Sequence, residues 1–176
     1  MSLIIFLIYL ENYTEFAKTY NISYNITNIW KRGDVWNMKN NYFYAMLSRM
    51  KYINRWGLMR NTRNENLSEH SLEVAFIAHA LGVINNEVFG GDINAERLAV
   101  LGMYHDVTEI ITGDMPTPVK YYSPYIRNAY KEVEQVANEQ MLSGLPEVLR
   151  ARYEGLLLET ENEAGLWEYV KAADRI

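Results

Sequence analysis

Two of the three histidines in this 176-residue chain stand beside carboxylates, in the pairs Glu69-His70 and His105-Asp106. Imidazole nitrogens and carboxylate oxygens together suit Zn, Mn, Fe, Co or Ni, and side chains from several helices of a bundle can converge on one ion. Adjacent residues on a helix point about 100° apart, so His105 and Asp106 can share an ion only if it lies between their directions, near the helix surface. The pattern predicts a mixed nitrogen and oxygen metal site.

Glu109 follows His105 by four residues and Asp106 by three, which places all three side chains on one face of a helix. An ionised carboxylate on that face would be unfavourable in a dry core unless it were paired or used for proton transfer. We therefore expect Glu109 to transfer a proton. His79 follows His70 by nine residues, about half a turn round the helix, so we do not expect His79 to bind the ion.

Each of these residues also has an ordinary structural interpretation. A single histidine in a helix is more often a hydrogen-bonded core or surface group than a ligand, and an isolated His-Asp pair occurs by chance in many chains. The structural interpretation suits His79, and it would suit His70 if that residue stood alone. The metal-site prediction therefore depends on several motifs taken together.

The elements that must position these side chains are helices. From Met38 onward, apolar residues recur at spacings of three and four, and no segment alternates as a strand would. We expect helices over residues 41–52, from Asn66 past Ile84, 95–111, 123–142, after Pro146, and from Asn162 to the end. Asn66 and Glu69 have the spacing of a capping box. The sequence predicts an all-α bundle of about six helices.

Residues 1–37 differ from the rest, because they are crowded with Asn, Tyr and Ile and carry no persistent helical stripe. We interpret them as an N-terminal extension, non-native or poorly ordered, followed by one domain at 38–176. The first ten residues are apolar but fall short of the roughly 20 that a spanning helix needs. They also lack the cationic start of a secretory signal, so we expect no membrane segment and no targeting signal.

Composition excludes several classes of function. The formal net charge of −5 offers no basic excess for gripping a nucleic-acid polymer, so we expect a small-molecule substrate. The absence of cysteine excludes disulfides, thiolate zinc sites and a cysteine nucleophile, and it fits a reducing cytoplasm. The chain also lacks a Walker-type glycine-rich loop and an Asp-x-Asp nucleophile loop. These absences exclude the P-loop and Asp-x-Asp classes of phosphate-handling enzymes.

Five motifs carry a family resemblance. They are Asn54-Arg55-Trp56, Arg63-x-Glu65-Asn66-x-Ser68-Glu69-His70-Ser71, Tyr104-His105-Asp106-x-x-Glu109, Gly113-Asp114-x-Pro116-Thr117-Pro118-Val119-Lys120 and Lys171-Ala172-Ala173-Asp174. In this order they resemble the bacterial 5'-deoxynucleotidases of the HD-domain superfamily (YfbR type), from Met38 to the last residue. The resemblance implies a metal-dependent phosphohydrolase with the HD-domain fold that converts deoxyribonucleoside 5'-monophosphates to deoxyribonucleosides and phosphate.

The resemblance implies a divalent cation, cobalt or manganese in assays, held by His70, His105, Asp106 and Asp174. The assignment of Asp174 rests on the resemblance alone, since as a bare feature it would be a solvated helical carboxylate. The assignment of His70, His105 and Asp106 also agrees with the ligand chemistry argued above.

The resemblance also implies the residues that bind the substrate. Arg55 orients the phosphate, which makes it catalytic together with Glu109, and Trp56 contacts the nucleoside. The remaining substrate contacts implied are His70, Asp106, Asp114, Met115, Pro116 and Thr117, of which the last four line the sugar side. A guanidinium binds phosphate as a fork and an indole supplies a flat wall. Without the resemblance, Arg55 would be interpreted as a surface cation and Trp56 as a core aromatic.

Alternatives to the deoxynucleotidase stay open at this stage. The chain can be another HD-type nucleotide phosphohydrolase, or a non-catalytic module that binds nucleotides through the same metal and phosphate contacts. The family continues with helical sequence after the equivalent of Asp174, so we also expect an incomplete C-terminal end, which would hold Asp174 loosely or leave the product inactive. The resemblance further implies a homodimer.

Overall fold

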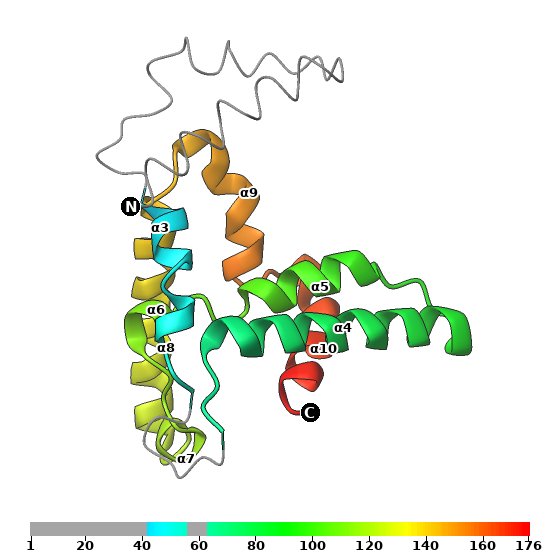
Figure 1. Cartoon of the computed structure of the whole chain (residues 1–176), viewed down its shortest axis with the longest axis horizontal. Coiled ribbons are helices and arrows are strands. Elements are labelled where there is room, and N and C mark those ends of the chain that lie inside the picture. The colour runs from blue at the N-terminus through cyan, green and yellow to red at the C-terminus, as the bar shows by residue number, and fades with distance from the viewer. Residues whose placement is uncertain (1–41, 56–62) are drawn as a thin grey trace. The chain divides into compact units, whose positions relative to one another are not determined.

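The computed structural model describes residues 42–55 and 63–176 of the chain, which belong to the unit Met38–Ile176. Residues 1–37, predicted to be an extension, and Trp56 lie outside the described residues. Within these described ranges, five helices have ten or more residues: α4 (Leu67–Phe89), α5 (Ala95–Tyr104), α8 (Pro124–Ser143), α9 (Glu147–Leu157) and α10 (Ala164–Asp174). Shorter elements are α3 (Phe43–Leu47), η1 (Met50–Tyr52), α6 (Glu109–Thr112), α7 (Thr117–Lys120) and η2 (Glu161–Glu163). The described part contains no strand, only an isolated bridge between Asn54 and Asn66, which confirms the all-α prediction (Figure 1).

The start of α4 is set by a capping box, as the sequence predicts. The side-chain oxygen of Asn66 accepts hydrogen bonds from the amides of Ser68 (3.0 Å) and Glu69 (3.1 Å). The carboxylate of Glu69 in turn accepts from the amide of Asn66 at 3.3 Å. These bonds satisfy amides that the first turn of a helix leaves unpaired. The helix ends at Gly90, whose φ of +70° lies in the left-handed region that favours glycine.

Glycines allow α4 and α5 to pack with their backbones close together. A Cβ built at Gly102 would lie 2.8 Å from the Cα of Ala75, and one at Gly82 would lie 3.1 Å from the Cα of Ala95. Any larger residue at Gly102 would therefore push the two helices apart. α10 packs against both helices (Figure 1). This arrangement brings together the helices that carry the chemistry predicted from the sequence.

The predicted helix over 95–111 is interrupted at its centre, so the prediction is wrong there. α5 ends at Tyr104 and α6 begins at Glu109. In the turn between them, the amide of Glu109 donates to the carbonyl of Asp106 at 3.0 Å, three residues back rather than four. Such tightening is typical of 3₁₀ geometry, which is common where a helix meets a functional site. His105 and Asp106 therefore stand in a turn between two helices.

The predicted helix over 41–52 is likewise divided, into α3 and η1. The amide of Arg49 donates to the carbonyl of Met46 at 2.8 Å, which again tightens the chain to a three-residue spacing. The hydroxyl of Ser48 donates to the carbonyl of Ala45 at 2.7 Å and so competes with the regular helical bonds. The last predicted helix begins close to its expected start, with η2 leading into α10.

α8 begins where the sequence predicts. The hydroxyl of Ser123 accepts from the amide of Ile126 at 3.2 Å, and Pro124 occupies the first turn, where its missing N–H costs nothing. Beyond its C-terminal end, the carbonyl of Gly144 accepts from the amide of Phe43 at 3.1 Å. α3, α6, α7 and α9 all contact α8 (Figure 1).

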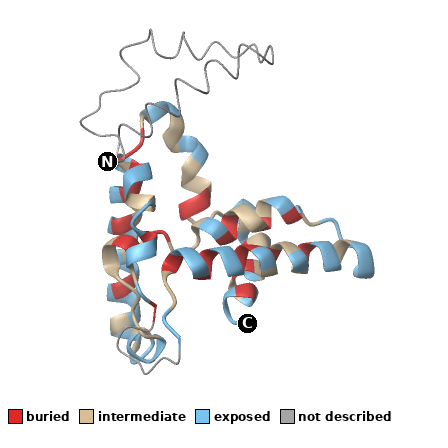
Figure 2. Cartoon of the chain, in the orientation of Figure 1, coloured by how far each residue is buried: buried red, intermediate tan, exposed pale blue. Residues whose placement is uncertain are grey.

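Residues coloured as buried recur along the faces of the helices that turn toward one another (Figure 2). Fully buried members of the core include Leu67, Ala78, Leu98, Leu101 and Val170. α4 is the one helix in the described part that is long and apolar enough to cross a membrane by length and composition alone. Because α4 packs against α5 and α10 and contributes to this core, we interpret it as a central core helix.

Candidate metal centre

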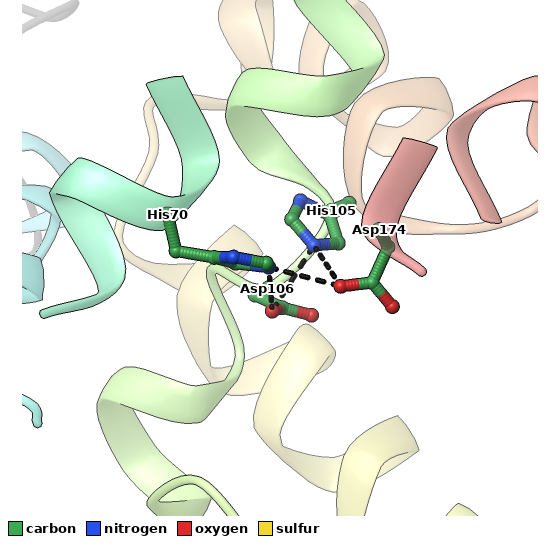
Figure 3. Close-up of side chains that lie close together, drawn as sticks. All are labelled: His70, His105, Asp106 and Asp174. Carbon is green, nitrogen blue, oxygen red and sulfur yellow. Dashed lines mark hydrogen bonds and ion pairs between the residues drawn. The ribbon is translucent and has the colours of Figure 1, made fainter. Parts of the chain in front are cut away.

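The four predicted metal ligands lie together. One nitrogen or oxygen atom from each of His70, His105, Asp106 and Asp174 lies within 4.8 Å of the others (Figure 3). Nε2 of His70 is 2.9 Å from Oδ1 of Asp174 and 3.5 Å from Oδ2 of Asp106. Nε2 of His105 is 3.0 Å from Oδ2 of Asp106 and 3.7 Å from Oδ1 of Asp174. α4, the turn after α5 and the end of α10 thus converge on one cluster.

A backbone contact fixes the orientation of the His105 ring. Its Nδ1–H donates to the carbonyl oxygen of Gly102 at 2.8 Å, so Nε2 is the nitrogen that faces the two carboxylates. This buried Nε2 makes no hydrogen bond with any described residue, although Oδ2 of Asp106 is 3.0 Å away. A hydrogen bond at one ring nitrogen that leaves the other pointing at carboxylates is typical of a metal-ligating histidine.

The cluster has an unusual charge balance. Burial opposes protonation of His105, but the carboxylate of Asp106, with help from Asp174, outweighs it and raises the pKa of His105 to about 10. Burial would raise the pKa of Asp106, yet His105 lowers it overall. The adjacent imidazole rings of His105 and His70 hold the pKa of Asp174 well below its usual range. Without a cation, the site therefore holds a proton on an imidazole between two carboxylates.

Arg55 lies at the edge of this cluster. Its Nη1 donates to Oδ2 of Asp106 at 2.9 Å, and its Nη2 is 3.9 Å from Oδ1 of Asp174. The residue is buried, with 9% of its surface exposed, so the interpretation as a surface cation is excluded. The amide of Arg55 also donates to the carbonyl of Glu65 at 2.9 Å, which ties the segment before α4 to the segment after η1. A buried guanidinium is thereby held next to the proposed ligands.

Glu65 is a site residue to which the sequence gave no role. Its Oε1 lies 3.3 Å from Nδ1 of His70 and 3.2 Å from Nε of Arg55, so one carboxylate oxygen contacts both a proposed ligand and the adjacent cation. The one sequence feature that could have indicated a role for Glu65 is its position in the motif directly before Asn66. Carboxylates behind ligating histidines commonly fix the tautomer and the ring orientation.

Glu109 begins α6, one turn beyond the His105-Asp106 pair. Burial, followed by the negative charges of Asp106 and Asp114, raises the pKa of Glu109 to about 9. Its Oε2 is buried and has no hydrogen-bond partner among the described residues. The carboxyl group is therefore protonated at neutral pH in the metal-free chain.

The other predicted site residues are less closely gathered. Asp114 is half-buried between α6 and α7 and acts electrostatically on Glu109, whereas Met115 and Pro116 are half-buried and Thr117 is exposed at the start of α7. Trp56 lies outside the described residues. Among the described residues, the ligand cluster comprises His70, His105, Asp106 and Asp174 and does not include His79.

The donor set fits a divalent cation. Two imidazole nitrogens and two carboxylate oxygens suit a first-row transition ion, and ligands must be deprotonated to bind it. The buried Nε2 of His105, aimed at two carboxylates without a hydrogen bond, marks where a cation would replace the proton. The charge of a bound ion would balance the two carboxylates in place of the proton on His105.

Comparison with known proteins identifies the family of this chain. Residues 42–176 match the family described as 5'-deoxynucleotidase YfbR-like. The chain belongs to this family. A 5'-deoxynucleotidase of Photorhabdus laumondii is 51% identical over 135 residues, which cover 77% of this chain and 68% of that protein. Another, from Vibrio vulnificus, is 51% identical over 139 residues, covering 79% and 72%.

A solved structure of an HD-domain phosphohydrolase from Listeria innocua matches 76% of this chain with a TM-score of 0.68 and 26% identity. The matched part spans 63% of that structure's chain, less than two thirds of its length. The YfbR-like chain thus has the HD-domain fold, and the resemblance stated on its five motifs is confirmed.

Proposed function

We propose that this YfbR-like chain is a metal-dependent 5'-deoxynucleotidase that hydrolyses deoxyribonucleoside 5'-monophosphates. The observation that carries the proposal is the cluster of His70, His105, Asp106 and Asp174 within 4.8 Å, with the guanidinium of Arg55 beside it. The names of the relatives from Photorhabdus laumondii and Vibrio vulnificus support the same activity. Two histidines and two aspartates that can hold a metal ion, next to a buried guanidinium, suit a site that binds a phosphoryl group.

In this proposal, His70, His105, Asp106 and Asp174 hold the divalent cation, for which cobalt and manganese are our candidates in assays. The cation supplies Lewis-acid charge to the phosphoryl group when it is bound. His70 and Asp106 also touch the substrate at this centre. The contact from Gly102 holds Nε2 of His105 toward the site.

Arg55 orients the phosphate. Its planar guanidinium can offer paired N–H donors to phosphate oxygens, and its burial strengthens those bonds. The ion pairs with Asp106 and Glu65 hold the guanidinium in place before substrate binds. Trp56, the next residue along the chain, is proposed to supply the flat wall for the nucleoside.

Glu109 is the proposed proton-transfer residue. In the hydrolysis, the oxygen of water bonds to phosphorus and the bond from phosphorus to O5' breaks. Water gives up one proton, and O5' of the departing deoxynucleoside takes one up. In the metal-free chain, burial and the charges of Asp106 and Asp114 raise the pKa of Glu109 to about 9, so this carboxyl group can carry a proton to O5'. Asp114, Met115, Pro116 and Thr117 are proposed to line the sugar side.

The proposed substrate is a small molecule rather than a nucleic-acid polymer, in keeping with the formal net charge of −5. We propose that the chain acts in the cytoplasm, as a homodimer and without a membrane. Size-exclusion chromatography with light scattering tests the homodimer independently of activity.

The decisive assay measures phosphate release from a panel of deoxyribonucleoside and ribonucleoside 5'-monophosphates, with cobalt, manganese, zinc and magnesium each added to chelator-treated protein. We expect release from the deoxy compounds that needs the cation and is lost in Asp106→Ala. Glu168→Ala, an exposed carboxylate on α10, is the matched control. Cation binding without phosphate release from any nucleotide would instead support a non-catalytic nucleotide-binding module.

A further inference from the structure

One turn of α8 holds both ends of the segment proposed to line the sugar side, residues 114–117. This segment follows α6 and runs into α7, so its position depends on what anchors Gly113 before it and Lys120 after it. Gly113 has a φ of +73°, a left-handed conformation at which the chain turns away from α6. The helical bonds of α6 end at this point, so the segment needs other contacts to fix its direction.

Tyr130 of α8 anchors the end near Gly113. Its hydroxyl donates to Oγ1 of Thr112 at 3.2 Å, and the hydroxyl of Thr112 donates to the carbonyl of Gly113 at 3.0 Å. Each hydroxyl has one proton to donate, so the two bonds form a directed chain from α8 to the turn. Tyr130 is 6% exposed, and a buried hydroxyl chain of this kind is costly to leave unpaired.

Glu134 of α8 anchors the other end. The ammonium group of Lys120, the last residue of α7, donates to Oε1 of Glu134 at 2.7 Å. The same ammonium group lies 4.7 Å from the centre of the Tyr130 ring, in position for a cation–π contact. Both side chains of this ion pair are about one-quarter to one-third exposed, so solvent screens the pair only in part.

Tyr130 and Glu134 are four residues apart on α8 and therefore lie on one face of the helix, one turn apart. Through Lys120, Tyr130 also contributes to the second anchor, so the two ends of residues 114–117 are tied to the same turn. The side-chain hydrogen bonds and ion pairs of Tyr130 and Glu134 with other described residues go to Thr112, Gly113 and Lys120, and none goes to a member of the ligand cluster.

We propose that Tyr130 and Glu134 are positioning residues for substrate specificity, which hold residues 114–117 against the sugar of the bound nucleotide. This inference rests on the proposed function, because it takes the nucleotide to be the substrate and residues 114–117 to be its sugar contacts. Fixing Asp114 at one distance from the site lets its carboxylate discriminate between a sugar with a 2'-hydroxyl and one without it. A looser segment accommodates both sugars.

The test compares Tyr130→Phe and Glu134→Gln with two controls on the same helix. Tyr125→Phe removes a hydroxyl from a residue that is 82% exposed, and Glu132→Gln neutralises an exposed carboxylate. For the two anchor variants, we expect KM for deoxyribonucleoside monophosphates to rise about threefold to tenfold, the range expected for loss of one ordinary hydrogen bond. We expect kcat to change less than KM, the preference for deoxyribose to fall, and the controls to match the wild type.

Two readouts separate positioning from general disruption. Calorimetric titration with manganese should give the same affinity in the anchor variants as in the wild type, because the ligand cluster is untouched. Hydrogen exchange should rise in residues 113–121 of the anchor variants while α4 and α5 stay protected. Loss of manganese binding together with activity would overturn the inference, because the anchors would then support the whole fold.

Unchanged KM and unchanged sugar preference in both anchor variants of an active enzyme would also overturn the inference, and would leave the proposed function standing. A wild-type chain that releases phosphate from no nucleotide would overturn the proposed function and the specificity role with it. The double variant should raise KM little more than either single variant does, because both anchors hold one segment.

Discussion

Oε1 of Glu65 lies 3.3 Å from Nδ1 of His70, on the side of the ring opposite the nitrogen that faces the ligand cluster. A carboxylate beside Nδ1 favours the tautomer with its proton there, which leaves Nε2 free to bind a cation. The same oxygen contacts Nε of Arg55 at 3.2 Å. Glu65 therefore couples the orientation of a proposed metal ligand to that of the proposed phosphate-binding cation.

Glu65→Ala should weaken binding of a divalent cation by about tenfold to a hundredfold, the range typical of losing a carboxylate behind a ligating histidine. Isothermal titration calorimetry with manganese measures this directly. Glu65→Gln should keep more affinity, because its amide oxygen can still accept from Nδ1. Glu73→Ala, an exposed carboxylate on α4, should behave as the wild type. Equal affinities for wild type and Glu65→Ala would remove this role.

Cation binding should stabilise the fold in proportion to its affinity. At a cation concentration a hundred times Kd, the wild type should gain about 2.7 kcal/mol in its free energy of unfolding, since the unfolded chain has no assembled site. Asp174→Ala should lose most of that gain, because its Oδ1 lies 2.9 Å from Nε2 of His70. Thermal melts with and without manganese compare the two proteins, with Glu168→Ala as the control on α10. If manganese stabilised Asp174→Ala as much as it stabilises the wild type, Asp174 would be excluded as a ligand.

The parts of the fold predicted from the sequence are those governed by local signals. The capping box of Asn66 and Glu69, and the Ser123-Pro124 start of α8, involve contacts within a few residues, so composition and spacing were sufficient. The turn at His105 has no such signal. It depends on the His105 ring bonding to the carbonyl of Gly102 and on the packing of α5 against α4, which single-sequence periodicity does not contain.

The site shows the same division. His70, His105 and Asp106 were predicted as ligands from residue type and spacing, whereas Asp174 is 104 residues from His70 and was predicted from the family resemblance alone. Glu65 had no assigned role because its partners His70 and Arg55 become neighbours only through the backbone pairing of residues 53–55 with 65–67. Long-range contacts of this kind have no periodic trace in a sequence.

The raised pKa of Glu109 predicts how stability of the metal-free chain depends on pH. In the folded chain the carboxyl keeps its proton up to about pH 9, whereas in the unfolded chain it loses the proton near its ordinary pKa of 4.5. Between these values the folded state binds more protons, so raising the pH favours unfolding, by up to about 1.4 kcal/mol per pH unit. His105 acts in the same direction, from its ordinary pKa of 6.5 up to about 10.

Glu109→Gln should therefore flatten the fall in stability between about pH 5 and pH 9 without abolishing it, because the contribution of His105 remains. Urea unfolding in the presence of a chelator, repeated across this pH range, measures the difference between wild type and variant. The variant should be more stable than the wild type at pH 8. Parallel pH profiles for the two proteins would show that Glu109 titrates normally in the folded chain. The same variant should also lose turnover while it still binds manganese, if Glu109 transfers the proton.

The close approach of α4 and α5 predicts opposite effects for two glycine-to-alanine changes. At Gly102 a Cβ would lie 2.8 Å from the Cα of Ala75, so Gly102→Ala should separate the helices and cost about 1 to 3 kcal/mol in the free energy of unfolding. At Gly165, early in α10, a Cβ would meet nothing within 4 Å, so Gly165→Ala should stabilise the helix by about 0.5 to 1 kcal/mol. Denaturant titrations of both variants measure these effects.

Because the carbonyl of Gly102 also orients the ring of His105, Gly102→Ala should disturb the metal site as well as the packing of the two helices. Gly102→Ala should lower manganese affinity even at temperatures where the variant is fully folded, whereas Gly165→Ala should bind manganese as the wild type does. A Gly102→Ala chain that is destabilised but binds manganese normally would show that helix spacing and ligand geometry are independent. Loss of both properties together would show that the glycine sets the distance at which His70 and His105 meet.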